Sequence, residues 1–297
     1  MNTLKTRVIV GLLYFCALLP LALARSLGRI LGRIYWPIGG RSRKVTQRNI
    51  RAAFPELTPR QQDRLARRSI IATGELIAEM GHIWMRPWEY VAGLIKQVHG
   101  VELIVEAQEA GRGVIVLAPH LGNWEVVGLH AATLGTMISL FEPPPLPKLG
   151  SVIKKARERS GATLVPTDSR GLAKLLRSVK RGDLSGILPD QAPPELGSGE
   201  NSPFMGVSCF TPTLASNMIR RTGALAVFCY ARRIPGGFSL HYELAEPDIY
   251  NEDTGVSLAA MNRGVEACVR QCVEQYQWEY KRFRVRPRNG VGIYDDM

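Results

Sequence analysis

The segment Ala118–Glu125, with the sequence APHLGNWE, constrains the fold more than any other part of the chain. It follows the apolar, β-branched run Val114–Leu117. A short run of this kind that ends in Pro and Gly predicts a buried strand leading into a turn. Residues five apart on one helix point about 140° apart. We therefore place His120 in the turn and Glu125 in the first turn of a following helix, where the two side chains can face each other.

A histidine and a carboxylate in this arrangement are typical of general base catalysis. Histidine is the usual base near neutral pH, and a carboxylate fixes its tautomer and stabilises its protonated form. The plainer alternative is that His120 only packs or caps at the end of a strand. The sequence contains no G-x-S-x-G elbow, no Walker A motif and no G-x-G-x-x-G. This leaves direct acyl transfer, in which His120 deprotonates an acceptor hydroxyl that attacks a thioester. Backbone N–H groups at the helix start, or an arginine, would stabilise the oxyanion.

Apolar runs and helical patterns alternate along the rest of the chain, which predicts an α/β fold with a mixed sheet layered by helices. In such sheets chemistry sits outside the carboxyl ends of the strands, and both His120 and Asp190 occupy such a position. Residues 189–206 are expected to form a loop. We expect helices over 40–98 (broken at Phe54-Pro55), 102–110, 125–134, 151–160, 171–181 and 256–283, and strands over 114–117, 163–166, 184–188, 224–230 and 238–244.

The N-terminal residues carry most of the net charge of +12. Residues 1–55 contain ten basic and no acidic residues, which leaves the rest of the chain at +2. Within them Val8–Ala24 is uncharged, and Arg25, Arg29 and Arg33 follow it. Basic residues after an apolar segment hold that side in the cytoplasm. We therefore expect residues 1–36 to form an N-terminal membrane anchor with a basic amphipathic continuation, and residues 37–297 to form a cytoplasmic domain.

Two alternatives for this segment stay open: a cleaved signal peptide with an A-x-A site at Ala22–Ala24, and a helix lying in the membrane interface. The basic residues match no nucleic-acid-binding motif, so no nucleic acid is expected as a partner.

The number of cysteines, five, is odd, and they form no C-x-x-C motif, which is typical of a protein in a reducing compartment. Neither they nor the scattered histidines suggest a metal site, and no cofactor is expected.

Several motifs in a fixed order extend beyond the His120 block. They are an I-x3-R-x3-G run (Ile153, Arg157, Gly161), LPDQ at Leu188–Gln191, a P-F-x-G element at Pro203–Gly206, and QYQWEYKRFRVRP at Gln275–Pro287. Together with the H-x4-[D/E] block, they make nearly the whole chain resemble the late acyltransferases of lipid A biosynthesis, the lauroyl/myristoyl type. The H-x4-[D/E] motif alone is shared with glycerolipid acyltransferases.

The resemblance implies a glycerolipid-acyltransferase-like fold at the bacterial inner membrane, anchored by one N-terminal helix. It implies an acyl carrier protein thioester as donor, a hydroxyacyl group of a lipid A precursor as acceptor, and contact with inner-membrane lipids. It assigns the catalytic pair to His120 and Glu125. The substrate-binding residues that we expect are Asn123, Arg157, Asp190, Gln191 and Arg282.

The cluster of Lys154, Lys155, Arg157 and Arg159 is basic, as an acidic carrier protein or a phosphorylated glycolipid would require. Many family members carry a basic, Asn-containing segment after the motif helix, whereas this chain has Glu142 in a proline-rich loop. Two other functions remain open. One is the same chemistry on a lysophospholipid or another glycolipid, and the other is a non-catalytic membrane-surface protein of the same fold.

Overall fold

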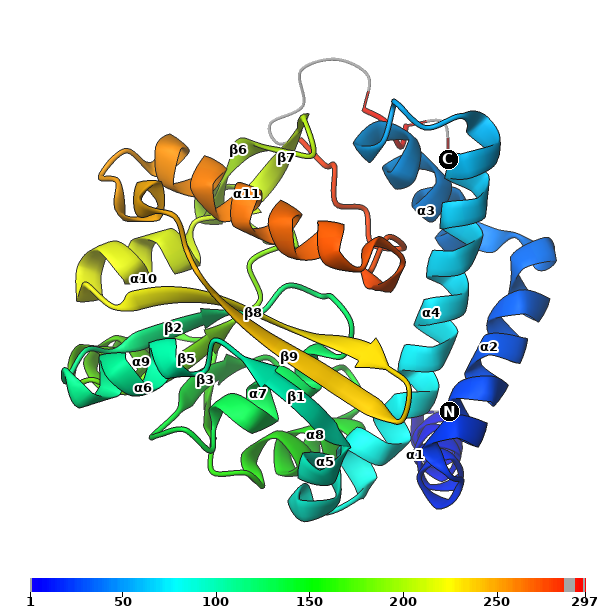
Figure 1. Ribbon diagram of the computed structural model, residues 1–297, viewed down its shortest axis with the longest axis horizontal. Helices are drawn as coiled ribbons and strands as arrows, with labels where there is room; N and C mark the ends of the chain where they lie inside the picture. The colour runs from blue at the N-terminus through cyan, green and yellow to red at the C-terminus, as the bar shows by residue number, and fades with distance from the viewer. Residues whose placement is uncertain (1, 286–291, 296) are drawn as a thin grey trace.

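A five-stranded sheet forms the centre of the computed structural model, which describes residues 2–285, 292–295 and 297 (Figure 1). The strands β8 and β9 are antiparallel, and the other neighbouring strands are parallel. The predicted mixed sheet is therefore confirmed. In spatial order the strands are β1 (Ile95–His99), β9 (Gly237–Leu244), β8 (Leu225–Ile234), β2 (Val114–Leu117) and β5 (Leu184–Ile187).

Strand β2 lies inside this sheet, and all four of its residues are buried. Val114 and Val116 pack into one hydrophobic core, whereas Ile115 and Leu117 pack into another. Alternate residues of a strand point to opposite faces of a sheet, so β2 stands between the two cores. The apolar, β-branched run is thus explained by burial on both faces.

Helices cover both faces of the central sheet. The helices α6 (Glu102–Glu109) and α7 (Trp124–Ala131) contribute to one core, and α10 (Leu214–Thr222) and α11 (Thr254–Gln271) contribute to the other. Further helices are α3 (Gly40–Ala53), α5 (Trp88–Leu94), α8 (Pro147–Glu158) and α9 (Ser169–Lys180), and α1, α2 and α4 are described below. Short 3₁₀ turns cover Leu196–Ser198, Pro247–Tyr250 and Val273–Gln275.

The other four strands of the described residues form two smaller, two-stranded sheets. Parallel β3 (Ile138–Phe141) and β4 (Thr163–Pro166) lie next to β5, and antiparallel β6 (Gly199–Phe204) and β7 (Val207–Pro212) form a hairpin beside α11. This hairpin occupies part of 189–206, so the expectation of a loop throughout was wrong there. The expected helix over 40–98 also ends early, because residues 95–99 pair with β9.

The C-terminal helix was expected to reach residue 283 but ends at Gln271. The chain beyond it lies against the loop after β2 instead. Leu121 and Tyr276 form a β-bridge, and the Gln277 N–H donates to the His120 carbonyl at 3.0 Å. Tertiary backbone hydrogen bonds therefore override a helical pattern in this segment.

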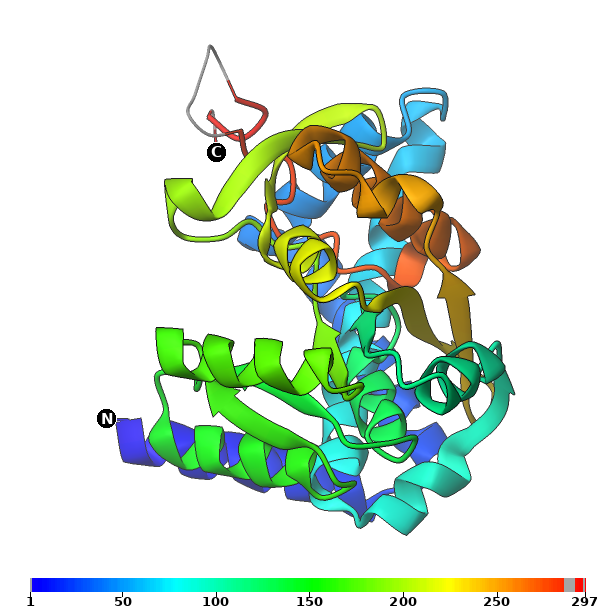
Figure 2. The same ribbon diagram turned by 90° about the vertical axis from the view of Figure 1, so that its left-hand side faces the viewer.

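The N-terminal segment forms two helices, α1 (Asn2–Leu18) and α2 (Leu21–Ile38), separated at Pro20. Helix α2 packs along the 27-residue helix α4 (Pro59–Met85), and α1 contacts both α4 and α8 (Figures 1 and 2). Gly28 and Gly74 allow this close approach, since a Cβ on either would lie within 2.4 Å of a backbone oxygen of the other helix.

Among the helices of the described residues, none is long and apolar enough to cross a membrane. The expected spanning anchor is therefore not supported. The physical reason is that Pro20 interrupts the uncharged segment, and that Arg25, at its end, is buried inside the fold.

Candidate active site

The loop between β2 and α7 is held in one conformation by backbone contacts. Gly122 has a φ of +58°, and a Cβ there would lie 2.0 Å from the Ala231 oxygen. The N–H of Gly122 donates to the Gln275 carbonyl, and that of Asn123 to the Ala231 carbonyl, both at 3.0 Å. A glycine is required at this turn both by its positive φ and by the closeness of β8. The loop thus places His120 at the carboxyl end of β2.

His120 is paired with Asp190, which follows the neighbouring parallel strand β5. The distance from His120 Nδ1 to Asp190 Oδ1 is 2.8 Å, and the His120 backbone N–H donates to Asp190 Oδ2 at 2.9 Å. An ionised carboxylate only accepts hydrogen bonds, so Nδ1 carries the proton and Nε2 is the ring's acceptor in the neutral form. This is the arrangement of a general base and its orienting carboxylate.

Asp190 is almost fully buried, yet it is held in its ionised form. Burial alone would raise the pKa of Asp190, but the His120 charge, the two hydrogen bonds and the charge of Arg282 together hold it below its usual value. Tyr276 also forms a hydrogen bond with Asp190, and burial raises the pKa of this phenol well above its usual range. Tyr276 therefore stays protonated and can donate to the carboxylate.

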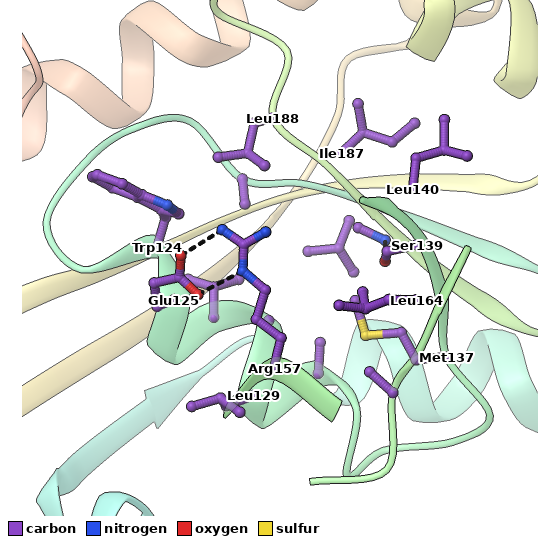
Figure 3. A pocket seen from close by; sticks show the side chains of 17 residues that line it. Trp124, Glu125, Leu129, Met137, Ser139, Leu140, Arg157, Leu164, Ile187 and Leu188 are labelled. Atoms are coloured by element: carbon purple, nitrogen blue, oxygen red, sulfur yellow. Dashed lines mark hydrogen bonds and ion pairs between the residues drawn. The ribbon is translucent and has the colours of Figure 1, made fainter. Parts of the chain in front are cut away.

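Glu125 does not pair with His120 in the structure, contrary to the expectation from spacing. It lies in the first turn of α7 and receives two hydrogen bonds from Arg157 of α8, at 2.9 Å from Nε and 2.6 Å from Nη2 (Figure 3). Burial lowers the pKa of Arg157, but the charge and hydrogen bonds of Glu125 raise it overall. The spacing argument failed because it considered only partners within the motif and could not include α8.

The Glu125–Arg157 pair lies at one end of an apolar cavity (Figure 3). The third guanidinium nitrogen of Arg157, Nη1, is turned away from Glu125 toward the cavity. The ring of Trp124, another lining residue, lies 4.9 Å from that of His120, which places the cavity close to the base. The apolar lining comes from β2, α7, β3, β4, β5 and residues next to them, and includes Val116, Ala118, Val127, Leu129, Ala131, Met137, Leu140, Ala162, Leu164, Ile187 and Leu188.

Asn123 is fully buried and lies in a cluster of charges behind the loop. Its Nδ2 donates to Glu79 Oε2 at 3.1 Å. Glu79, also fully buried, accepts from Arg25 Nε and from Arg233 Nε, each at 2.6 Å. Arg25 further donates to two carbonyls of the β8–β9 turn, at Ile234 and at Gly237. This cluster ties α2, α4 and the β8–β9 hairpin to the loop that carries His120.

The other two expected substrate-binding residues also bond within the protein. Gln191 Nε2 donates to Gln277 Oε1 at 3.3 Å. Arg282 is buried and donates to Asn262 Oδ1 at 2.8 Å and, at longer distances, to Phe210 O and Thr211 Oγ1. Arg282 thus acts on Asp190 through its charge, from inside the core.

Sequence reasoning missed Glu79, Arg25, Arg233 and Tyr276. Tyr276 lies within the Gln275–Pro287 block, which was a usable signal. The two arginines and Glu79 carry no local signal, because only the tertiary fold brings them together. In the part of the chain that the structure describes, no group of three or more His, Cys, Asp or Glu residues could hold a metal ion.

The chain is similar to a family of known proteins along nearly its whole length. The family model for bacterial lipid A biosynthesis acyltransferases matches residues 3–285. The chain is 25% identical over 290 residues to a lipid A biosynthesis lauroyltransferase of Escherichia coli K12, covering 96% of this chain and 93% of the relative. It is 26% identical over 279 residues to a lipid A biosynthesis myristoyltransferase of the same strain (90% and 82%).

A lipid A biosynthesis acyltransferase of Haemophilus influenzae is 23% identical over 289 residues, covering 95% of this chain and 89% of the relative. The family match spans nearly the whole chain, including the loop of His120, Asp190, Glu125 and Arg157. The resemblance inferred from the motifs is therefore confirmed. The chain is an acyltransferase and belongs to the bacterial lipid A biosynthesis acyltransferase family.

Proposed function

We propose that this enzyme transfers a fatty acyl chain from an acyl carrier protein thioester to the hydroxyl of an acyl group on a lipid A precursor. The observation that carries the proposal is the His120–Asp190 pair at the carboxyl ends of β2 and β5, beside an apolar cavity. A base with a fixed tautomer next to an apolar cavity is what direct transfer between two lipid chains requires.

In this mechanism His120 Nε2 takes the proton of the acceptor hydroxyl while Asp190 stabilises the imidazolium that forms. The oxygen attacks the thioester carbonyl, a C–O bond forms, and the tetrahedral intermediate collapses by breaking the C–S bond. The departing thiolate takes the proton back from His120. No covalent acyl-enzyme is needed, so atoms and charge balance without a further reactant.

Arg157 is the proposed donor to the oxyanion. The N–H groups of Leu121, Gly122 and Asn123 already donate to protein carbonyls, so the loop itself offers few free donors. Glu125 occupies only Nε and Nη2 of Arg157 and orients the rest of the guanidinium toward the cavity. A pre-oriented cation in a site of low dielectric stabilises developing negative charge strongly.

The apolar cavity is proposed to hold the donor's acyl chain, with the thioester near Trp124 and Arg157. The basic cluster of Lys154, Lys155, Arg157 and Arg159 on and just after α8 would attract the acidic carrier protein. Lys155 and Arg159 line a second, neighbouring pocket with Trp84 of α4, which extends this basic surface.

The proposed location is the cytoplasmic side of the bacterial inner membrane, with α1 and α2 lying in the membrane interface. Many of the exposed large apolar side chains lie on these two helices, and the segment carries ten basic and no acidic residues over 1–55. Apolar insertion together with attraction to anionic lipids is the pattern of an interfacial helix. The exposed apolar residues are Leu4, Val8, Leu12, Tyr14, Phe15, Leu18, Leu23, Ile30, Leu31, Ile34 and Ile38.

The test is mass spectrometry of lipid A from a strain that lacks its own late acyltransferases and carries this chain or its His120→Ala variant. We expect a mass gain of one acyl chain with the wild type and none with the variant at equal expression. Lipid A of unchanged mass with a well-expressed wild type would contradict the proposed acceptor and direct the search to lysophospholipids and other glycolipids.

A further inference from the structure

A second apolar groove, separate from the cavity at Arg157, runs between α2 and α4. It has a volume of about 470 Å³ and shares no lining residue with that cavity. The ribbon shows the two helices side by side along much of their length (Figure 1). The residues that line the groove are Leu31, Gly32, Ile34, Tyr35, Ile38, Ser42, Ile70, Thr73, Gly74, Ile77 and Glu279.

The groove contains one acidic group, Glu279, which reaches it from the segment after η3 (Val273–Gln275). Thr73 Oγ1 donates to Glu279 Oε2 at 3.2 Å. Burial raises the pKa of Glu279, and the charge of His120 acts on it in the opposite direction. The same segment also supplies the Gln277 N–H that bonds to the His120 carbonyl. The segment that carries Glu279 therefore connects this end of the groove to the loop that carries His120.

The outer end of the groove opens among exposed apolar side chains. Ile38 and Ile77 are 73% and 65% exposed, and Leu31 and Ile34 are more than half exposed. Leu31, Ile34 and Ile38 belong to the exposed apolar surface of α2, and Ile77 lines the same groove from α4. Helix α2, which supplies Leu31, Ile34 and Ile38, also belongs to the segment with ten basic and no acidic residues over 1–55. An apolar groove whose mouth lies on an apolar, cationic surface is complementary to a lipid with an anionic headgroup.

We propose that the α2–α4 groove admits an acyl chain of the lipid acceptor directly from the membrane and leads its hydroxyl to His120. This inference rests on the proposed function and adds the route of the acceptor. Donor and acceptor chains then occupy two separate apolar sites that meet at the base. Glu279 is a positioning residue at the inner end, where it can accept a hydrogen bond from a hydroxyl of the chain.

The first test uses the purified full chain with an acyl carrier protein thioester and a lipid A precursor in mixed micelles. The variant Ser42→Trp places a large ring in the groove, and Ile30→Trp, on the same surface but outside the groove, is its matched control. We expect Ser42→Trp to raise the KM for the lipid acceptor at least tenfold. The KM for the thioester and its slow hydrolysis without acceptor should not change.

Ile30→Trp should leave all three quantities unchanged, and thermal unfolding should show that both variants fold. A normal acceptor KM in folded Ser42→Trp would overturn the proposal, as would an equal rise in both KM values. Glu279→Gln adds a readout that a purely structural role would not move. It should raise the acceptor KM severalfold without altering the thioester KM, and an unchanged acceptor KM would remove Glu279 from the proposed route.

A second measurement separates this inference from the proposed function. A lipid A precursor with a photoreactive group in one acyl chain is cross-linked to the wild-type chain, and the labelled peptides are identified. We expect labels on α2 and α4 at groove residues. Labels there without acyl transfer would retain the groove and contradict the proposed function. Transfer with labels only elsewhere would retain the function and contradict the groove.

Discussion

The two carboxylates of the candidate site, Asp190 and Glu125, differ in what surrounds them. Asp190 is closed in by His120, Tyr276 and the charge of Arg282, with almost no exposure to solvent. Glu125 is also buried, but its partner Arg157 has a side chain that is about one-third exposed and borders the apolar cavity. Asp190, the closed carboxylate, is therefore suited to orienting a base. Glu125 and Arg157, the open pair, are suited to binding a ligand.

The largest effect is expected at the closed carboxylate. Asp190→Asn removes the acceptor that fixes Nδ1–H and the charge that stabilises the imidazolium. We expect kcat to fall by about 10²–10⁴, nearly as far as in His120→Ala. Glu125→Gln keeps His120 and Asp190 intact, so its loss of kcat should be smaller by an order of magnitude or more. Steady-state kinetics on the three folded variants measure this, and an equal loss in Asp190→Asn and Glu125→Gln would erase the difference between the two sites.

The buried Glu79 cluster behind the loop predicts an effect on stability. Glu79→Gln removes the buried carboxylate that Arg25 and Arg233 share and leaves only the more distant Glu75 to balance them, at a cost of about 3–5 kcal/mol in the free energy of unfolding. Glu125→Gln should cost clearly less, because Arg157 can reach water. Urea denaturation of both variants measures the difference. A Glu79→Gln variant as stable as the wild type would mean that this cluster does not hold the loop in place.

This effect depends on pH with a definite sign. Burial alone would raise the pKa of Glu79, but its arginine partners hold it below its ordinary value of 4.5. A carboxylate with a lowered folded pKa adds stability above its unfolded pKa and loses it as the pH falls through the folded one. The difference between wild type and Glu79→Gln should therefore be constant above about pH 5 and shrink on acidification. A difference that grows toward low pH would contradict the lowered pKa.

A smaller effect is expected at the open pair. Arg157→Lys keeps the positive charge but loses the two-pronged contact with Glu125 and the orientation of the guanidinium. We expect kcat/KM for the thioester to fall about tenfold with little loss of stability. Lys154→Arg, on the exposed side of α8, is the control and should behave as the wild type. A fully active Arg157→Lys enzyme would show that only the charge matters.

The smallest expected effect belongs to Tyr276. Tyr276→Phe removes one hydrogen bond to the ionised Asp190 while preserving the aromatic packing against Trp278 and Phe204. Because both bonds from His120 to Asp190 remain, only part of the roughly 1.5–3 kcal/mol of such a bond should reach the transition state, and we expect kcat to fall by about 2- to 10-fold. Single-turnover assays resolve a change of this size. A loss as large as that of Asp190→Asn would place Tyr276 in the chemistry itself.

Sequence reasoning predicted the parts of the fold that depend on local patterns. The buried strand β2 is confirmed, because its apolar, β-branched run and the Pro and Gly that follow it agree. It failed where distant backbone decides the structure. Residues 272–283 were expected to be helical, but they form a short 3₁₀ turn and irregular turns that contact the His120 loop.

The candidate site shows the same division. The sequence placed His120 and Asp190 at the carboxyl ends of strands, and the structure brings them into contact. It also selected Glu125 and Arg157 but could not pair them, since the partner of a carboxylate depends on tertiary packing. Asn123 was expected to bind substrate, yet it is buried against Glu79, and no feature of the motif distinguishes these two roles.

The central claim is that Asp190, rather than Glu125, orients His120, and a pair of double-mutant cycles on the single-turnover rate tests it most directly. When two residues act as one unit, replacing both lowers the rate little further than replacing one of them. We predict that His120→Ala with Asp190→Asn is within about threefold of His120→Ala alone. Adding Glu125→Gln to His120→Ala should lower the rate by the same factor as Glu125→Gln does in the wild-type background. The account would be contradicted if Asp190→Asn lowered the single-turnover rate of His120→Ala by its full wild-type factor while Glu125→Gln lowered it no further.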